Sequence, residues 1–156
     1  MPVEPFRGSD HPTLGVELEL QIVDATSFDL APVGDDILET IPAELVESVK
    51  PELYQCCVEI NTAICHDVDE VGRDLAAKLE LVEERARRFG ARVAWGGSHP
   101  FAHWLDQEIS VSPRYHKLID VNQDTIRRQL TFGLHVHVGV LDGDTAARVC
   151  TRGSHY

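Results

Sequence analysis

The sequence lacks the features that would place it in a membrane or a secretory pathway. Its 156 residues contain no apolar run of about 18 residues, the length that a transmembrane helix needs. The first residues, MPVEPFRGSDHP, do not have the basic and then apolar pattern of a signal peptide. We therefore expect a cytoplasmic protein.

Basic charge is also scarce. The chain has 14 Lys and Arg against 26 Asp and Glu, which gives a net charge of −12. This balance argues against binding to nucleic acid or to an anionic membrane surface, because both need a basic footprint. Surplus carboxylates suit divalent cations, although a solvated acidic surface accounts for the same composition.

The four cysteines show no CxxC spacing, the common motif of thiolate metal sites. Cys56 and Cys57 are adjacent, so in a strand their side chains point to opposite faces and cannot easily bind one ion together. We expect reduced cysteines that pack as small apolar residues, as is usual in a reducing compartment.

The chain is long enough for one domain with a hydrophobic core, and no internal repeat divides it. Three segments alternate apolar and polar residues with the period of two that is typical of strands, at 13–23, 54–61 and 130–140. A long helix is predicted over 67–89, where apolar residues recur at intervals of three and four. A second helix is predicted over 112–129.

Helix ends follow from local chemistry. Asp67 or Asp69 can cap the long helix, and Gly90 can end it. Asp142 or Asp144 can cap a last helix, which we expect to stop after about two turns. Because the strands alternate instead of being apolar on both sides, we predict an α+β fold, a mostly antiparallel sheet with helices packed on one face.

The polar faces of the three strands carry the chemistry. The first strand offers Glu17 and Glu19, the second Glu59 and Asn61, and the third His135 and His137 between two glycines, Gly133 and Gly139. If the strands share a sheet, all these groups stand on the face opposite the core. Gathered carboxylates repel one another, so protons or cations must offset the charge.

Oxygen ligands from several strands suit Mg²⁺ or Mn²⁺, which also bind substrate phosphates. Two other interpretations stay open. A Glu-x-Glu pair on an amphipathic strand is often simply exposed to solvent. His135, His137 and one glutamate would also suit zinc, as in a small zinc hydrolase.

Five blocks resemble a known family in order and spacing. They are TLGVELELQIVD, VKPELYQCCVEINTAICHDVDEV, GGSHPFAHWLDQEIS, RYHKLI and RRQLTFGLHVHVGVLDGDTAARV. Together they are similar to the N-terminal half of the carboxylate–amine ligases of the glutamate–cysteine ligase type 2 family, the YbdK-like proteins. The resemblance implies a curved antiparallel sheet like the glutamine synthetase catalytic domain, here incomplete, which carries ATP and divalent metal on its concave face.

The resemblance also implies an ATP-dependent ligation. The γ-carboxylate of glutamate would be phosphorylated, and the amine of cysteine or another amine would attack the acyl phosphate. By position, Glu17, Glu19 and Glu59 match the metal-binding carboxylates. His135 matches a catalytic histidine near the metal and the nucleotide phosphates and is the fourth expected metal ligand, while His137 and Asn61 match the edge of the cofactor pocket.

The sequence departs from the family at two places. The usual block GVEEEF reads GVELEL here, and Leu18 should point to the packed face, leaving the acidic pair intact. The likeness covers 13–149, so we interpret 1–12 as a leader and 150–156 as a tail foreign to the family, as a frameshift or early stop would give. Family members are more than twice as long.

We therefore expect a truncated ligase that is weakly active or inactive alone. It would form a homo-oligomer or need a complementing second half, because the sheet edge and helix faces would otherwise be exposed. A non-catalytic Mg²⁺–ATP-binding remnant or module is the main alternative. The pocket-loop residues Ser98 and His99 could border the site or only hold the loop.

Overall fold

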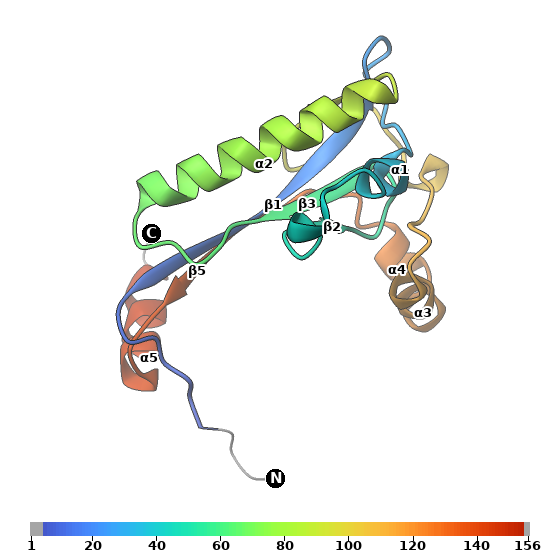
Figure 1. Cartoon of the computed structure of the whole chain (residues 1–156). Helices are drawn as coiled ribbons and strands as arrows, with labels where there is room; N and C mark the ends of the chain where they lie inside the picture. Colours follow the sequence, from blue (N-terminus) through green and yellow to red (C-terminus); the bar gives the residue numbers. More distant parts are fainter. Residues whose placement is uncertain (1–4, 155–156) are drawn as a thin grey trace.

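The computed structural model describes residues 5–154, and its centre is an antiparallel sheet of five strands (Figure 1). The strands are β1 (Thr13–Asp24), β2 (Val49–Pro51), β3 (Cys57–Asn61), β4 (Ala91–Ala94) and β5 (Leu134–Gly139). The helices are α1 (Gly34–Leu38), α2 (Val68–Arg88), α3 (Pro113–Asn122), α4 (Asp124–Arg127) and α5 (Gly143–Gly153), with 3₁₀ turns at Ala43–Leu45 and Trp104–Asp106. The predicted α+β class with an antiparallel sheet is confirmed.

β1 is the central strand of the sheet. β3 lies along one edge of it, with Glu17 opposite Asn61 and Glu19 opposite Glu59, and β2 continues the sheet beyond β3. Two strands share the other edge of β1: β5 pairs with its first half and β4 with its last residues. The three segments predicted as strands are therefore neighbours in one sheet.

The apolar face of this sheet is covered by α2, which lies along it in Figure 1. The buried residues of this core are Leu20, Ile22, Ile37, Ile41, Val49, Val58, Ile60, Val82, Ala86 and Ala91. Leu18 packs against the same core, so the apolar residue in the GVELEL block leaves the polar face free, as predicted. Alternation along β1 and β3 thus separates the core from the polar groups.

The ends of α2 are those that the sequence predicts. The Asp67 carboxylate caps the first turn and accepts a hydrogen bond from the Glu70 amide at 2.7 Å. Gly90 follows the helix with a φ of 70°, a backbone conformation that few residues other than glycine adopt. The last turn carries Arg85, Arg87 and Arg88, which suit the negative end of the helix dipole.

The predicted helix over 112–129 is wrong in one respect, because two short helices replace it. Gln123 separates α3 from α4 with a φ of 49°, and its amide donates to the Ile119 carbonyl at 2.7 Å. The break turns Ile126 back toward a second apolar cluster around Tyr54 and Tyr115. Tertiary packing therefore overrides a helical pattern that continues in the sequence.

Two other boundaries differ from the predictions. The second strand begins at Cys57 instead of Tyr54, because the preceding residues form backbone contacts elsewhere: Tyr54 bridges Ile109, and the Gln55 amide donates to the Glu108 carbonyl at 2.9 Å. The last helix, α5, has 11 residues, longer than the two turns expected, and Asp142 caps it through the Thr145 amide at 2.7 Å.

The side chains of β5 are less protected than those of the other strands. Leu134, Val136 and Val138 are exposed, although they continue the apolar face of the sheet beyond α2. Residues 5–12 precede β1 without a helix or strand of their own. Within 5–154, none of the helices combines the length and the apolar character that crossing a membrane requires.

Candidate functional site: an acidic cluster on the open face of the sheet

Three glutamates from different segments converge on the polar face. Glu19 comes from β1, Glu59 from the facing position of β3, and Glu52 from the residue after β2. One carboxylate oxygen of each lies within 4.8 Å of the other two. Among the residues that the structure describes, this is the one such group of three or more His, Cys, Asp or Glu.

Local hydrogen bonds hold two of these carboxylates. Glu19 accepts a hydrogen bond from the Gly133 amide at 2.6 Å, and its own amide donates to the Gly133 carbonyl at 3.0 Å. Glu52 accepts from the Leu53 amide at 2.9 Å and lies 3.4 Å from the Tyr115 hydroxyl. Their side chains are therefore oriented before any ligand arrives.

A second polar group lies beside the first and contains the histidines. One oxygen of Glu17 is 3.4 Å from His135 Nδ1 and 3.3 Å from His137 Nε2. A methyl group on Gly133 would come within 3.1 Å of the His135 ring and 3.5 Å of Glu19. The absence of a side chain there leaves space where the two groups meet.

The predicted site residues thus share one face but divide into two sets. Glu19 and Glu59 join the carboxylate cluster, whereas Glu17 contacts His135 and His137 instead. Glu17 stays close enough for its charge to raise the pKa of Glu59. Gly139 does not open space for a ligand, because a side chain there would collide with Thr13.

Burial is the main reason that the pKa of Glu59 lies above its ordinary value. The negative charges of Glu17 and Glu52 raise it further, while the Asn61 amide and the Lys50 ammonium act in the opposite direction. A cation placed among these carboxylates would relieve both the repulsion and the lost solvation.

The residues of the cluster fit a hard divalent ion. Oxygen ligands at about 2.0–2.6 Å from Mg²⁺ or Ca²⁺ lie at most about 4–5 Å apart across the ion, which is the spacing found here. The side-chain oxygen of Asn61 is buried without a hydrogen-bond partner next to this cluster, so a further oxygen acceptor is free. The cluster contains no thiolate or imidazole, the ligands typical of zinc.

The thiols of Cys57 and Cys56, near the cluster, do not add a reactive ligand. Burial raises the pKa of Cys57 well above its ordinary value, and the Glu19 carboxylate raises it further. Burial likewise raises the pKa of Cys56 to about 12. Both thiols are therefore neutral near pH 7, and the four cysteines are unpaired.

A cavity of about 200 Å³ opens beside the acidic cluster. Its lining residues are Glu19, Glu52, Leu53, Tyr54, Cys57, Arg114, Tyr115, Leu118, Ile126, Gln129, Thr131 and Phe132. Carboxylates from the sheet side and the Arg114 guanidinium from α3 give it groups of both charge signs. It can therefore hold a small polar molecule that places an anionic group near Arg114 and a cationic group near the carboxylates.

Glu52 is the member of the cluster that the sequence analysis missed. It belongs to no alternating segment, and the extended backbone favoured before Pro51 is the only local signal near it.

The hydrogen bonds of the loop that contains Ser98 and His99 indicate a structural role for His99. His99 Nδ1 accepts from the Ala102 amide at 3.1 Å, and Nε2 lies 3.0 Å from the Phe28 carbonyl, so this ring fixes the loop.

The sequence profile of glutamate–cysteine ligase family 2 (GCS2) matches residues 13–156. The chain belongs to this family. Proteins named "Putative glutamate–cysteine ligase 2" from Gloeobacter violaceus and Thermobifida fusca are 45% and 42% identical to it over 155 residues. The alignments cover 97% of this chain but 41% and 39% of the relatives, so it spans about two fifths of their length and corresponds to an N-terminal part.

A solved structure shares the fold of this chain. The crystal structure of glutamate–cysteine ligase from Francisella tularensis in complex with AMP matches with a TM-score of 0.56 at 12% identity. The match covers 97% of this chain and 31% of that one. At this identity the likeness is one of fold, and it agrees with a partial catalytic domain.

Proposed function

We propose that this chain carries the acidic, cation-binding part of an ATP-dependent glutamate–cysteine ligase. The observation that supports it is the cluster of Glu19, Glu52 and Glu59 on the open sheet face of a member of this family. In the proposed reaction, a glutamate γ-carboxylate oxygen attacks the γ-phosphorus of ATP and ADP leaves. The nitrogen of cysteine or another amine then attacks the acyl carbon, phosphate leaves, and an amide forms.

The residues of the chain have distinct roles in this proposal. Glu19, Glu52 and Glu59 would hold Mg²⁺ or Mn²⁺, which when bound offsets the charge of the phosphate oxygens. Glu17 orients His135 and His137, whose exposed rings can donate hydrogen bonds to a nucleotide phosphate. His135, which lies nearer Glu19 through the gap at Gly133, is the candidate for contact with the reacting phosphoryl group.

The cavity next to the cluster is the proposed place of the acid substrate. Its volume of about 200 Å³ is below the 300–1,000 Å³ typical of larger organic ligands, so it suits an amino acid better than a nucleotide. Arg114 can pair with a carboxylate, and Glu52 with an ammonium group. The adenine nucleotide would then lie over the histidine side; that the related structure contains AMP supports a nucleotide substrate.

We propose that the isolated chain has little or no turnover. Leu134 and Val136 on β5, with Leu14, Val16, Val68, Val71 and Leu75, line an apolar groove of about 290 Å³ that stays open. A segment from the additional length of the relatives would cover this groove and add groups to the nucleotide side. Because the chain spans two fifths of those relatives, Mg²⁺–ATP binding without turnover is the second candidate function.

Cation affinity gives the direct test. Glu59→Gln and Glu19→Gln should each weaken Mn²⁺ binding, measured by calorimetry, by at least about tenfold, since even indirect metal contacts are worth that much. Glu84→Gln, on the exposed side of α2, is the matched control and should bind as the parent does. Unchanged affinity in both site variants would show that these carboxylates are not ligands.

Nucleotide chemistry is tested separately. ADP release with ATP, Mg²⁺, glutamate and cysteine should be absent or weak for this chain, while ATP binding in the presence of Mg²⁺ should be detectable. Rapid turnover by the isolated chain would contradict the need for a complementing segment. Stoichiometric zinc that survives purification would favour the zinc hydrolase instead.

A further inference from the structure

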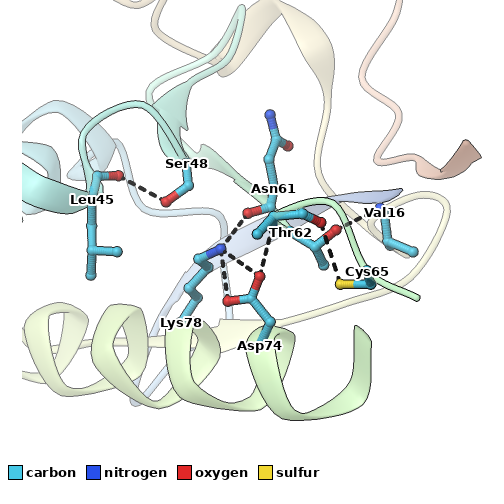
Figure 2. A network of polar contacts seen from close by, with 9 residues as sticks. Val16, Leu45, Ser48, Asn61, Thr62, Cys65, Asp74 and Lys78 are labelled. Atoms are coloured by element: carbon cyan, nitrogen blue, oxygen red, sulfur yellow. Dashed lines mark hydrogen bonds and ion pairs between the residues drawn. The ribbon is translucent and has the colours of Figure 1, made fainter. Parts of the chain in front are cut away.

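A buried lysine in the middle of α2 takes no direct part in the proposed site. Lys78 is only 6% exposed, and charged side chains are seldom buried to this extent unless they are paired. Its ammonium group lies 2.8 Å from Asp74 Oδ1 and donates to the backbone carbonyl of Asn61 at 2.6 Å (Figure 2). The lysine therefore joins the helix to the last residue of β3.

Asp74 extends this connection by one more bond. Its Oδ2 atom accepts from the Ala63 amide at 2.7 Å as well as from Lys78 at 2.9 Å. Burial tends to raise the pKa of Asp74, but the bonds from Lys78 and Ala63 bring it below its ordinary value, so the carboxylate stays charged. Thr62, between the two clamped residues, pairs with Val16 of β1 through its hydroxyl at 2.9 Å.

The side chain of Asn61 points the other way, toward the polar face. Figure 2 shows its amide directed away from Lys78 and Asp74. It stands opposite Glu17 in the sheet, and it lowers the pKa of Glu59. Its buried oxygen has no hydrogen-bond partner, an arrangement that destabilises the folded chain unless a ligand supplies the missing contact.

We propose that Lys78 is a positioning residue for the cation site, acting through Asn61. The inference rests on the proposed cation-binding function of the cluster. The ammonium group holds the Asn61 carbonyl from the core side, and this fixes the direction in which the Asn61 oxygen and the Glu59 carboxylate reach the ion. Lys78 itself is no ligand, because its positive charge would repel a cation.

The same helix supplies a matched control at its other end. Glu83 accepts from the Val93 amide of β4 at 2.7 Å and pairs with Arg87 at 3.1 Å and with Arg92. In both clamps a carboxylate on α2 accepts from a backbone amide, Val93 in β4 for Glu83 and Ala63, two residues after β3, for Asp74. Val93, however, pairs with Ile22 in the last part of β1, away from the cluster.

The test compares Lys78→Met with Glu83→Gln. For each variant, Mn²⁺ calorimetry and thermal unfolding are measured on the same purified preparation. Each variant should lower the unfolding midpoint, and only Lys78→Met should also weaken Mn²⁺ binding, by about tenfold. The sign of the change is informative. Removing a positive charge would by itself tighten cation binding, so weaker binding reports lost positioning.

The outcomes separate this inference from the function on which it rests. Parent protein that binds no Mn²⁺ overturns the cation site and the role of Lys78 together. Parent binding with unchanged or tighter binding in Lys78→Met overturns the role of Lys78 alone, as does an equal loss in Glu83→Gln. If Lys78→Met does not fold, Lys78→Gln, which keeps an uncharged N–H donor group, is measured against the same criteria.

Discussion

The two halves of β1 pack against different elements. The second half lies between β3 and β4 beneath α2, and Leu20 within it is fully buried. The first half lies beside β5, whose Leu134 is 63% exposed although it belongs to the same apolar face. The acidic cluster is placed at the junction, with Glu19 and Glu59 on the packed side and the histidines on the open side.

This difference separates what the chain can do alone from what needs more protein. The carboxylates of Glu19 and Glu59 stand on strands that the core holds in place, so their geometry is set within this chain. His135 and His137 stand on a strand covered on neither face. We therefore expect the isolated chain to bind a cation. We expect the phosphate contacts of His135 and His137 to depend on a further protein segment that covers β5.

The largest expected effect comes from the same substitution in each half. Leu20→Ala should lower the free energy of unfolding by about 2–5 kcal/mol, because it opens a cavity in a closed core. Leu134→Ala should change it by about 0.5 kcal/mol or less, as is usual for exposed positions. Urea denaturation measures both, and a large loss in Leu134→Ala would show that β5 is covered in solution, for example by a second copy of the chain.

Much of this arrangement could be predicted because it follows from local periodicity. Alternation alone put Glu17, Glu59 and His135 on one face, and the strand pairing agrees with that shared face. Their chemical roles stay predictions. Glu52 could not be predicted, since its position depends on Tyr54 bridging Ile109, a contact between segments far apart in sequence.

The helix break shows the same limit. Residues 112–129 continue a helical pattern, but Gln123 adopts a left-handed conformation so that Ile126 can reach the second apolar cluster. The stability gained by packing Ile126 depends on Tyr54 and Tyr115, and a window of local sequence does not reveal this contact. Contacts of long sequence separation therefore account for what the pattern missed, both in the fold and in the site.

A smaller effect is expected from the two aspartate caps. Asp67→Ala removes the cap of α2, a helix with buried residues, and should cost about 0.5–2 kcal/mol of global stability. Asp142→Ala removes the equivalent cap of α5, which buries no residue, and should leave the global transition unchanged. Hydrogen exchange should then speed up only within α5. Equal losses of global stability would mean that α5 is packed against something in solution.

The smallest effect should come from the unfavourable negative charge of Glu59 in the site without a cation. The pKa of Glu59 is raised on folding, so above that pKa the folded chain carries a penalty that the unfolded chain does not, and the penalty disappears as the pH falls through it. Without cation, Glu59→Gln should therefore raise the melting temperature at pH 7, by no more than about 2–4 °C, and the gain should vanish below the ordinary pKa of 4.5. Glu84→Gln should instead lower the melting temperature at pH 7, because Arg88 and Arg85 lower the pKa of Glu84.

Saturating Mn²⁺ should invert the order of the melting temperatures of Glu59→Gln and the parent, since only the parent keeps the full ligand set. A parent that melts above Glu59→Gln at pH 7 in EDTA would mean that Glu59 makes net favourable interactions in the folded chain, so that β3, beside the packed half of β1, holds no unfavourable charge for a cation to relieve.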